Sequence, residues 1–169
     1  VAERVFLSYK DKMHVHCIRP ATVCGYSPRM RLDVSVNMFT YQALKNGKMT
    51  VFGGNQTRPN IHIKDIANIY KHFIQNPNLP SGCYNAGFEN ISIKEIAEMV
   101  STIIPSKIEI TESNDPRSYR QDSSKLLRTG FEPKFSVLDA IKEIANKYEE
   151  NQLPDEDNCY TVKWMKKIK

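Results

Sequence analysis

The sequence predicts an α/β protein. Segments rich in β-branched and other apolar residues alternate with amphipathic segments of helical length, which is the pattern of strands joined by helices. The chain has 169 residues, the length of about one domain at roughly 150 residues per domain. Its 40% hydrophobic and 25% charged residues are ordinary for a globular protein. It contains no internal repeat and no long linker.

The first part of the chain is predicted to form a helix, a strand, a loop and a second helix. Residues 1–9 place apolar side chains at spacings of three and four, which favours a helix. Residues 13–18 are a strand that ends before a proline, because proline cannot donate to a sheet. Residues 20–31 are predicted as a loop. Residues 33–45 form a helix that Gly47 ends.

The middle of the chain continues this alternation. Residues 49–52 and 60–63 are predicted as short strands. A helix follows over residues 66–75, with Asp65 placed to cap its first turn. After a connector with two prolines, residues 82–86 are predicted as another strand.

The last part of the chain begins with a helix. Ser92, in the Ser-x-x-Glu spacing of a capping box, marks its start. A strand is predicted over residues 107–111, a short helix over 123–127 and a final helix over 136–148. The remaining residues are acidic and then basic, and we expect this tail to be loosely held.

Composition excludes several classes of function. The net charge of +5 comes mostly from lysines near the end of the chain, and no basic stripe with interleaved aromatics occurs elsewhere, so we expect no nucleic-acid partner. No apolar run reaches the ~18–20 residues of a membrane span, and no basic-then-apolar leader is present. The four cysteines lack metal or redox spacing. We therefore expect free thiols, no membrane association and a cytoplasmic location.

Arginines in predicted loops are the strongest candidates for ligand binding. Arg58 follows a Gly-Gly turn, and its planar guanidinium can bind two phosphate oxygens at once. The alternative is an ordinary surface arginine. Arg117, near Tyr119, is either a second cation for one anion site or part of a solvated loop. Arg29 and Arg31 leave the same choice open.

Local patterns give neither a catalytic nor a metal centre. Tyr41 and Lys45 have the Tyr-x-x-x-Lys spacing, in which an ammonium can lower the pKa of a phenol. A chain with eight tyrosines and many lysines is expected to hold about one such match by chance. His14 and His16 share a strand face but lack a third ligand. No Gly-x-Gly-x-x-Gly motif occurs, so we predict no catalytic residue and no metal ligand in this chain.

Five further motifs occur in a fixed order. They are Arg-Pro-Ala-Thr-Val-Cys-Gly-Tyr-Ser-Pro-Arg (19–29), Leu-Lys-Asn-Gly with Val-Phe-Gly-Gly (44–54), Thr-Arg-Pro-Asn-Ile-His-Ile-Lys-Asp-Ile-Ala (57–67), Tyr-Asn-Ala-Gly (84–87) and Arg-x-Tyr-x-x-Asp-x-x-Lys with Leu, Gly-Phe and Pro beyond (117–133). In this order they resemble the extended short-chain dehydrogenases, the NAD-dependent epimerase/dehydratases of nucleotide sugars. The resemblance covers roughly residues 1–150.

The resemblance implies the C-terminal part of an extended Rossmann-type short-chain dehydrogenase, including its smaller α/β substrate-binding domain. Residues 1–25 are then the end of the NAD domain: the tail of the catalytic helix, a strand and the nicotinamide-side loop. Residues 26–150 are mostly substrate-binding domain interleaved with the last Rossmann elements, and 151–169 a polar, basic tail. The family's glycine-rich loop and catalytic Tyr-x-x-x-Lys would precede Val1, so we expect a fragment.

The resemblance also assigns a cofactor, a substrate and their contacts. NAD or NADP is implied as the cofactor, beside a loop made of Pro20, Ala21, Thr22 and Val23. Thr22 stands where many members have Asn, and Cys24 replaces a Tyr. A nucleotide sugar is implied as the substrate. Its expected contacts are Asn37, Thr50, Val51, Phe52, Arg58 and Arg117, of which the two arginines would clamp the diphosphate.

We therefore expect the substrate-binding half of an NAD(P)-dependent nucleotide-sugar epimerase/dehydratase. In the whole enzyme, which we expect to be a homodimer, a tyrosine phenolate would deprotonate a sugar hydroxyl as a hydride passes to the cofactor. This chain alone is expected to lack turnover. One alternative is a non-catalytic binding or regulatory member of the same fold. Another is an independent interaction module that uses the lysine-rich tail, residues 163–169.

Overall fold

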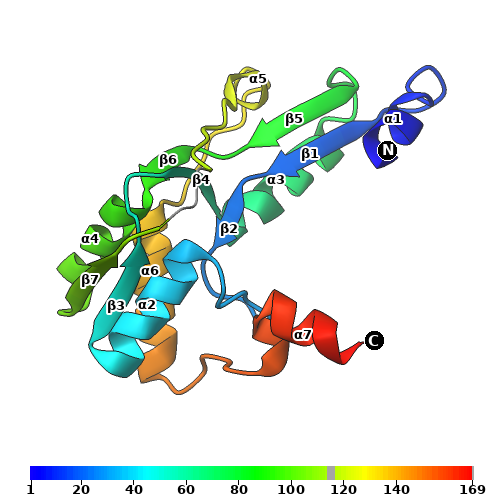
Figure 1. Ribbon diagram of the computed structural model, residues 1–169. Helices are drawn as coiled ribbons and strands as arrows, with labels where there is room; N and C mark the ends of the chain where they lie inside the picture. The colour runs from blue at the N-terminus through cyan, green and yellow to red at the C-terminus, as the bar shows by residue number, and fades with distance from the viewer. Residues whose placement is uncertain (114–116, 169) are drawn as a thin grey trace.

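The computed structural model describes residues 1–113 and 117–168. Asp115 and Pro116, which precede Arg117 in its motif, and Lys169 at the end of the basic tail lie outside the described residues. The elements in chain order are α1 (Ala2–Leu7), β1 (His16–Pro20), β2 (Thr22–Cys24), α2 (Ser35–Asn46), β3 (Lys48–Phe52), β4 (Thr57–His62), α3 (Ile63–Gln75), β5 (Gly82–Ala86), β6 (Glu89–Ser92), α4 (Ile93–Ile103), β7 (Lys107–Thr111), α5 (Ser124–Leu127), α6 (Val137–Glu149), a 3₁₀ turn η1 (Asp157–Cys159) and α7 (Thr161–Lys167), as Figure 1 shows.

The described strands form small sheets that are mostly parallel. β1 pairs with β5, with Cys17 opposite Cys83, and β3 pairs with β7, with Met49 opposite Ile108; both pairs are parallel. In the sheet between them, β4 pairs with β2 in parallel and with β6 antiparallel. Parallel pairs need long crossover connections, here mostly helical. The structure thus confirms the α/β class.

The chain passes from one sheet to the next at Ala21. Its N–H donates to the carbonyl of Ala86 at 2.8 Å, at the end of the β1–β5 pair. The next residues, Thr22–Cys24, form β2 on the edge of the central sheet. The loop predicted over residues 20–31 is therefore wrong at this point. The sequence prediction also omitted β6, and both missing strands are very short and depend on pairing with β4.

Two hydrophobic cores lie on either side of the central sheet. One packs α2, α4 and α6 against β3, with Phe39, Met49 and Val100 fully enclosed. The other packs α3 and α5 against β1 and β5 around Tyr84 and Ile69. The two groups of elements stand apart in Figure 1, joined by β2, β4 and β6. None of the described helices has the length and the apolar content needed to cross a bilayer.

Helix α3 begins differently from the prediction. His62 is its N-cap, and the ring nitrogen Nδ1 accepts the N–H of Lys64 at 3.1 Å. The predicted cap, Asp65, is fully buried in the first turn. Its carboxylate accepts the N–H groups of Lys134 and Phe135, at 3.1 and 3.0 Å. Asp65 therefore fixes a distant loop on the helix. The capping box at Ser92 is confirmed.

The C-terminal tail is ordered against the rest of the molecule, so the prediction of a loosely held tail is wrong. Asp155 accepts hydrogen bonds from Tyr41, from Lys45 at 2.9 Å and from Tyr160 at 2.8 Å. Cys159 is fully buried in a third, smaller core with Met30, Leu32 and Ile144. Polar residues hold this tail through a shared carboxylate, which composition alone does not reveal.

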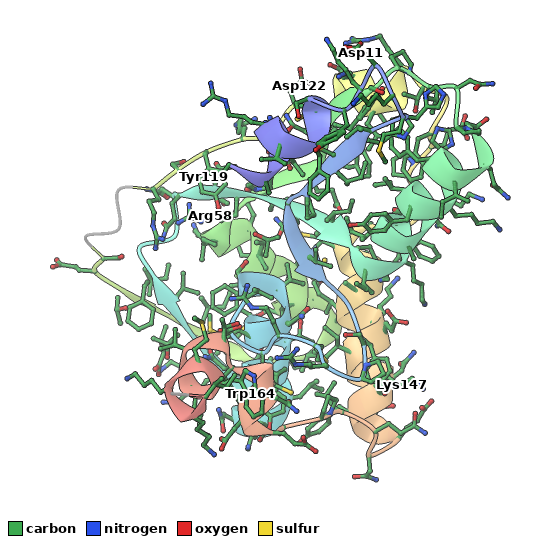
Figure 2. The ribbon with its side chains drawn as sticks, turned by 90° about the vertical axis from the view of Figure 1, so that its right-hand side faces the viewer. Asp11, Arg58, Tyr119, Asp122, Lys147 and Trp164 are labelled. Carbon is green, nitrogen blue, oxygen red and sulfur yellow. The ribbon has the colours of Figure 1, made fainter. Side chains whose placement is uncertain are left out.

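Acid is expected to release the tail. Hydrogen bonds from Tyr41 and Lys45 lower the pKa of Asp155 to about 2. Because this folded-state pKa lies below the ordinary value of about 3.9, the stabilisation is present above about pH 4 and is lost as the pH falls through about 2. The chain's one tryptophan, Trp164, lies in α7 (Figure 2). We expect its fluorescence to change across this pH range.

Asp155→Asn is the matched variant for this titration. Its tryptophan emission at neutral pH should already resemble that of the acid-treated protein. Far-UV circular dichroism, recorded in parallel, separates release of the tail from general unfolding. Identical emission and an identical acid transition in the two proteins would contradict the role given to Asp155.

Candidate functional site

A cavity of about 840 Å³ opens where β1 gives way to β2. Its lining residues come from the β1–β2 junction, the connector before α2, β4, the first residues of α2 and α4, and residues 117–121. They are Pro20, Ala21, Thr22, Val23, Arg31, Asp33, Val34, Ser35, Arg58, Pro59, Ile93, Arg117, Tyr119, Arg120 and Gln121. Part of the cavity therefore lies at the carboxyl end of β1, the end where open α/β sheets bind ligands.

The floor of the cavity depends on a close backbone approach at Gly87. A Cβ atom at this position would lie 2.6 Å from the Cβ of Ala21 and would also collide with the amide oxygen of Gln121. The Ser123 hydroxyl accepts the Gly87 N–H at 2.9 Å and donates to the Gly87 carbonyl at 2.8 Å. Only glycine lets the backbone just after β5 lie this close to the two lining residues.

One wall is an irregular segment, residues 117–121, held beside β4 and β6. The Ser118 hydroxyl accepts the Thr57 N–H at 3.0 Å, and the Thr57 carbonyl accepts the Tyr119 N–H at 3.3 Å. The Asn90 side chain accepts the Gln121 N–H at 2.8 Å and donates to the Gln121 carbonyl at 3.2 Å. These bonds bring the predicted Arg117 to the cavity.

The side chain of Arg58, in β4, is held in place by contacts within the protein. Its guanidinium donates to the carbonyls of Thr57, at 3.0 Å, and of Arg117. It also lies over the ring of Tyr119, 5.2 Å from the ring centre, and Figure 2 shows the two side chains together. Such an arginine loses less conformational entropy when it binds an anion.

The opposite wall carries an ion pair. The Nε of Arg31 donates to Asp33 at 2.8 Å. Although burial raises the pKa of Asp33, the hydrogen bonds from Arg31 and from the Thr161 N–H together bring it below its usual value. Asp33 is therefore ionised at neutral pH.

The lining suits anion binding rather than proton transfer. It contains four arginines, which stay protonated at all physiological pH values, and one carboxylate. Among the described lining residues there is no His, Cys or Lys. The net charge of the described lining is therefore positive.

The cavity joins six of the predicted site residues. Those six are Pro20, Ala21, Thr22, Val23, Arg58 and Arg117. The resemblance gave the first four to the cofactor and the last two to the diphosphate. The resemblance placed the loop over residues 27–37 at the sugar pocket without naming Asp33 as a contact, and it did not name Gln121. The spacing of Arg31 and Asp33, two residues apart in an extended segment, is the signal that could have placed both on one face.

The other four predicted residues lie outside this lining. Asn37 is buried. Its side-chain oxygen accepts the Gly25 N–H at 3.0 Å, and its side-chain NH₂ donates to the Arg31 carbonyl at 2.8 Å. In β3, Val51 is fully enclosed in the core and Phe52 is 58% exposed. Thr50 also lies outside the lining, and its N–H donates to the side-chain oxygen of Gln42 at 3.1 Å. Their contact with a substrate stays a prediction.

The Tyr-x-x-x-Lys match has a structural role. Lys45 donates to the phenol oxygen of Tyr41 at 2.8 Å, but the phenol also bonds to Asp155. Burial and the bond to Asp155 raise the pKa of Tyr41. A catalytic phenolate needs the opposite shift. This geometry supports the interpretation of the motif as a chance match.

Neither thiols nor metal ligands add to the site. The four cysteines are free, as predicted, and burial raises the pKa of Cys24 to about 12. Within residues 1–113 and 117–168, no group of three His, Cys, Asp or Glu is placed to hold a metal ion.

Known proteins share this architecture. The family model of the NAD dependent epimerase/dehydratase family matches residues 1–87, more than half of the chain. One similar solved structure is dTDP-glucose 4,6-dehydratase from Bacillus anthracis in complex with NAD. Its TM-score is 0.73 and its identity 20%, over 96% of this chain and 52% of that chain.

Two further solved structures are similar. UDP-glucuronic acid 4-epimerase from Bacillus cereus, in complex with a fluorinated UDP-sugar and NAD, has a TM-score of 0.73 and 23% identity, over 88% of this chain and 50% of that chain. RMD from Pseudomonas aeruginosa, complexed with NADPH, has a TM-score of 0.73 and 18% identity, over 89% and 54%. The chain thus spans about half the length of these proteins.

Substitution of Gly87 should damage the cavity floor. Gly87→Ala is expected to lower the free energy of unfolding by about 1–3 kcal/mol, the usual effect of overpacking. It should also weaken binding of inorganic pyrophosphate, because Ala21 and Gln121 must move. Urea denaturation and calorimetry measure the two effects.

Gly47→Ala is the control for this prediction. Gly47 has open space around it, but its φ of +62° strains any side chain, which is expected to cost about 1–2 kcal/mol. It lies outside the cavity lining, so its pyrophosphate affinity should not change. Equal affinities in both variants would remove the argument for a floor at Gly87.

Proposed function

Because the chain belongs to the NAD dependent epimerase/dehydratase family, we propose that these residues form the substrate-binding half of an NAD(P)-dependent enzyme that converts a nucleotide sugar. One observation carries this proposal. The strip Pro20–Val23, expected beside the nicotinamide, and the two arginines expected at the diphosphate line a single cavity.

The arginine pair fits a diphosphate. Arg58 and Arg117 come from different segments, and the Arg58 guanidinium bonds to the Arg117 backbone, which brings the two residues together. Guanidinium groups present two parallel N–H donors to phosphate oxygens. Two such groups from separate segments can hold both phosphates and orient the attached sugar, and orientation of this kind contributes to the rate of reaction.

The cofactor side fits as well. Pro20, Ala21, Thr22 and Val23 are uncharged and lie at the carboxyl end of a parallel strand. When bound, NAD or NADP would supply the acceptor and donor of the hydride. The chain's own residues would bind the substrate, orient it and keep one side of the nicotinamide dry. Similar structures contain NAD and NADPH, so the proposal includes both cofactors.

Proton transfer is assigned to residues outside these 169. Their sequence has no Gly-x-Gly-x-x-Gly loop, and the phenol in its one Tyr-x-x-x-Lys match is bonded to Asp155. The second candidate, a non-catalytic binding or regulatory member of the family, is favoured by this same observation. The complete reading frame distinguishes the two, since only an enzyme needs a second Tyr-x-x-x-Lys with a glycine-rich loop.

Two finer points belong to the proposal. The free cysteines support a reducing compartment such as the cytoplasm. A homodimer of the complete protein is supported by apolar side chains left exposed on α1 and α3, among them Phe6 and Ile74. Size-exclusion chromatography with light scattering on the complete encoded protein tests the dimer.

The 169-residue polypeptide should show no turnover. It is incubated with NAD⁺ or NADP⁺ and a panel of UDP-, dTDP-, GDP-, CDP- and ADP-sugars. We expect no absorbance of reduced nicotinamide and no change of the sugar by mass spectrometry or NMR, because these residues include no Gly-x-Gly-x-x-Gly loop and the phenol of their one Tyr-x-x-x-Lys match is bonded to Asp155. Turnover by this polypeptide would disprove the assignment. The complete encoded protein is the positive control.

Substitution of Arg58 should weaken binding of a nucleoside diphosphate. Arg58→Lys keeps the charge but loses the fork and the ring contact, so we expect about tenfold weaker binding of UDP, with Arg58→Ala weaker still. Arg128→Lys, an exposed arginine outside the cavity lining, is the control. Isothermal titration calorimetry gives the dissociation constants. If the Arg58→Lys variant and the wild type bound UDP with equal affinity, Arg58 would be an ordinary surface arginine rather than a phosphate ligand.

A further inference from the structure

The connector between β2 and α2 forms one wall of the cavity without a helix or strand of its own. Its side chains alternate. Met30 and Leu32 are buried, at 2% and 1% exposure, while Arg31 and Asp33 line the cavity. A wall of this kind is positioned by whatever its buried side and its backbone contact.

Besides Asn37 of α2 and Ile144 of α6, the C-terminal segment, residues 153–168, makes these contacts. The Leu32 N–H donates to the Cys159 carbonyl at 2.8 Å. The Thr161 N–H donates to Asp33 Oδ2 at 2.9 Å. The other oxygen of the same carboxylate, Oδ1, accepts Arg31 Nε at 2.8 Å. Asp33 therefore joins the C-terminal segment to an arginine of the cavity.

The segment is itself anchored at a second place. Asp155 is bonded to Tyr41 and Lys45 of α2 and to Tyr160, which directly precedes Thr161. The Thr161 N–H, which donates to Asp33, is therefore held in place by contacts with the second half of α2. The chain thus has a continuous set of hydrogen bonds from α2, through the tail, to the cavity.

We infer that Asp33 is a positioning residue for the anionic part of the substrate. Held by the Thr161 N–H, it keeps the Arg31 guanidinium turned toward the cavity, so that the C-terminal segment sets the affinity of the site for a diphosphate. The bond to Asp33 uses Nε, and anion binding uses the terminal nitrogens of the fork. This inference rests on the proposed function, which places a diphosphate in the cavity.

The sign of one effect separates positioning from simple electrostatics. Asp33 places a negative charge in a cavity meant for an anion, so its removal should tighten anion binding if charge alone matters. If Asp33 instead orients Arg31, its removal should weaken anion binding. If Asp33 had a purely structural role, its removal would lower the melting temperature, but this role gives no reason for weaker anion binding.

The test uses the complete encoded protein and two probes, inorganic pyrophosphate and UDP, with dissociation constants from calorimetry. Asp33→Asn keeps the size of the side chain and an oxygen for the Thr161 N–H. Arg31→Met removes the guanidinium, and the double variant closes a mutant cycle. Asp11→Asn, an exposed carboxylate in the loop after α1, is the matched control (Figure 2).

We expect Asp33→Asn and Arg31→Met each to weaken binding of both probes about tenfold, the factor typical of a lost charge-assisted hydrogen bond. The double variant should bind no worse than Arg31→Met, because Asp33 acts through Arg31. Asp11→Asn should bind like the wild type. Unchanged or tighter binding by Asp33→Asn, or an additive double variant, overturns the inference.

Asp155→Asn tests the tail without a change in the cavity lining, and it decides the matter should Asp33→Asn fail to fold. We expect it to weaken pyrophosphate binding by about threefold, a smaller effect because the remaining tail contacts persist. Wild-type affinity in a protein whose Trp164 emission shows a released tail overturns the inference. If the wild type binds neither probe, the proposed function fails as well. If it binds and only Arg58→Lys weakens binding, the inference alone fails.

Discussion

The cavity depends on one constraint: residues 117–121, which have no regular secondary structure, must lie against the edge of β4 and β6. Two bonds between Asn90 and Gln121 contribute to this constraint, because the Asn90 side chain accepts the Gln121 N–H and donates to the Gln121 carbonyl. The result resembles a strand pairing in which one side chain takes the place of a backbone partner. It gives the wall a fixed register, and that register places Tyr119 over Arg58.

The charge of its arginines explains why the cavity suits anion binding. Arginine cannot release its proton, so a lining with four of them is a permanent cation. Such a site can bind and orient an anion over a wide pH range. The one carboxylate of the lining, Asp33, is kept ionised by its bonds to Arg31 and Thr161. The proposed function therefore assigns binding to these residues and proton transfer to others.

Much of this arrangement could be predicted from the sequence, and the failures have a common cause. Local signals were sufficient for most of the helices, as at the Ser92 capping box, although α7 was not predicted. Motif order was sufficient to associate Arg58 and Arg117 with the strip Pro20–Val23. The strand β2 and the order of the tail were missed because both depend on partners distant in sequence. The bond between Thr161 and Asp33 joins residues 128 positions apart, and no local pattern of either segment encodes it.

The Tyr41–Lys45 pair shows why spacing alone does not decide chemistry. The two residues do meet on one helical face, with their polar atoms 2.8 Å apart, as the motif predicts. In a catalytic pair the ammonium is the dominant neighbour and favours the phenolate. Here Asp155 accepts hydrogen bonds from both groups, and a carboxylate beside a phenol disfavours its ionisation. The two residues that would form a catalytic base and its activating cation therefore hold the tail instead. Through the tail they help to position the wall that carries Arg31.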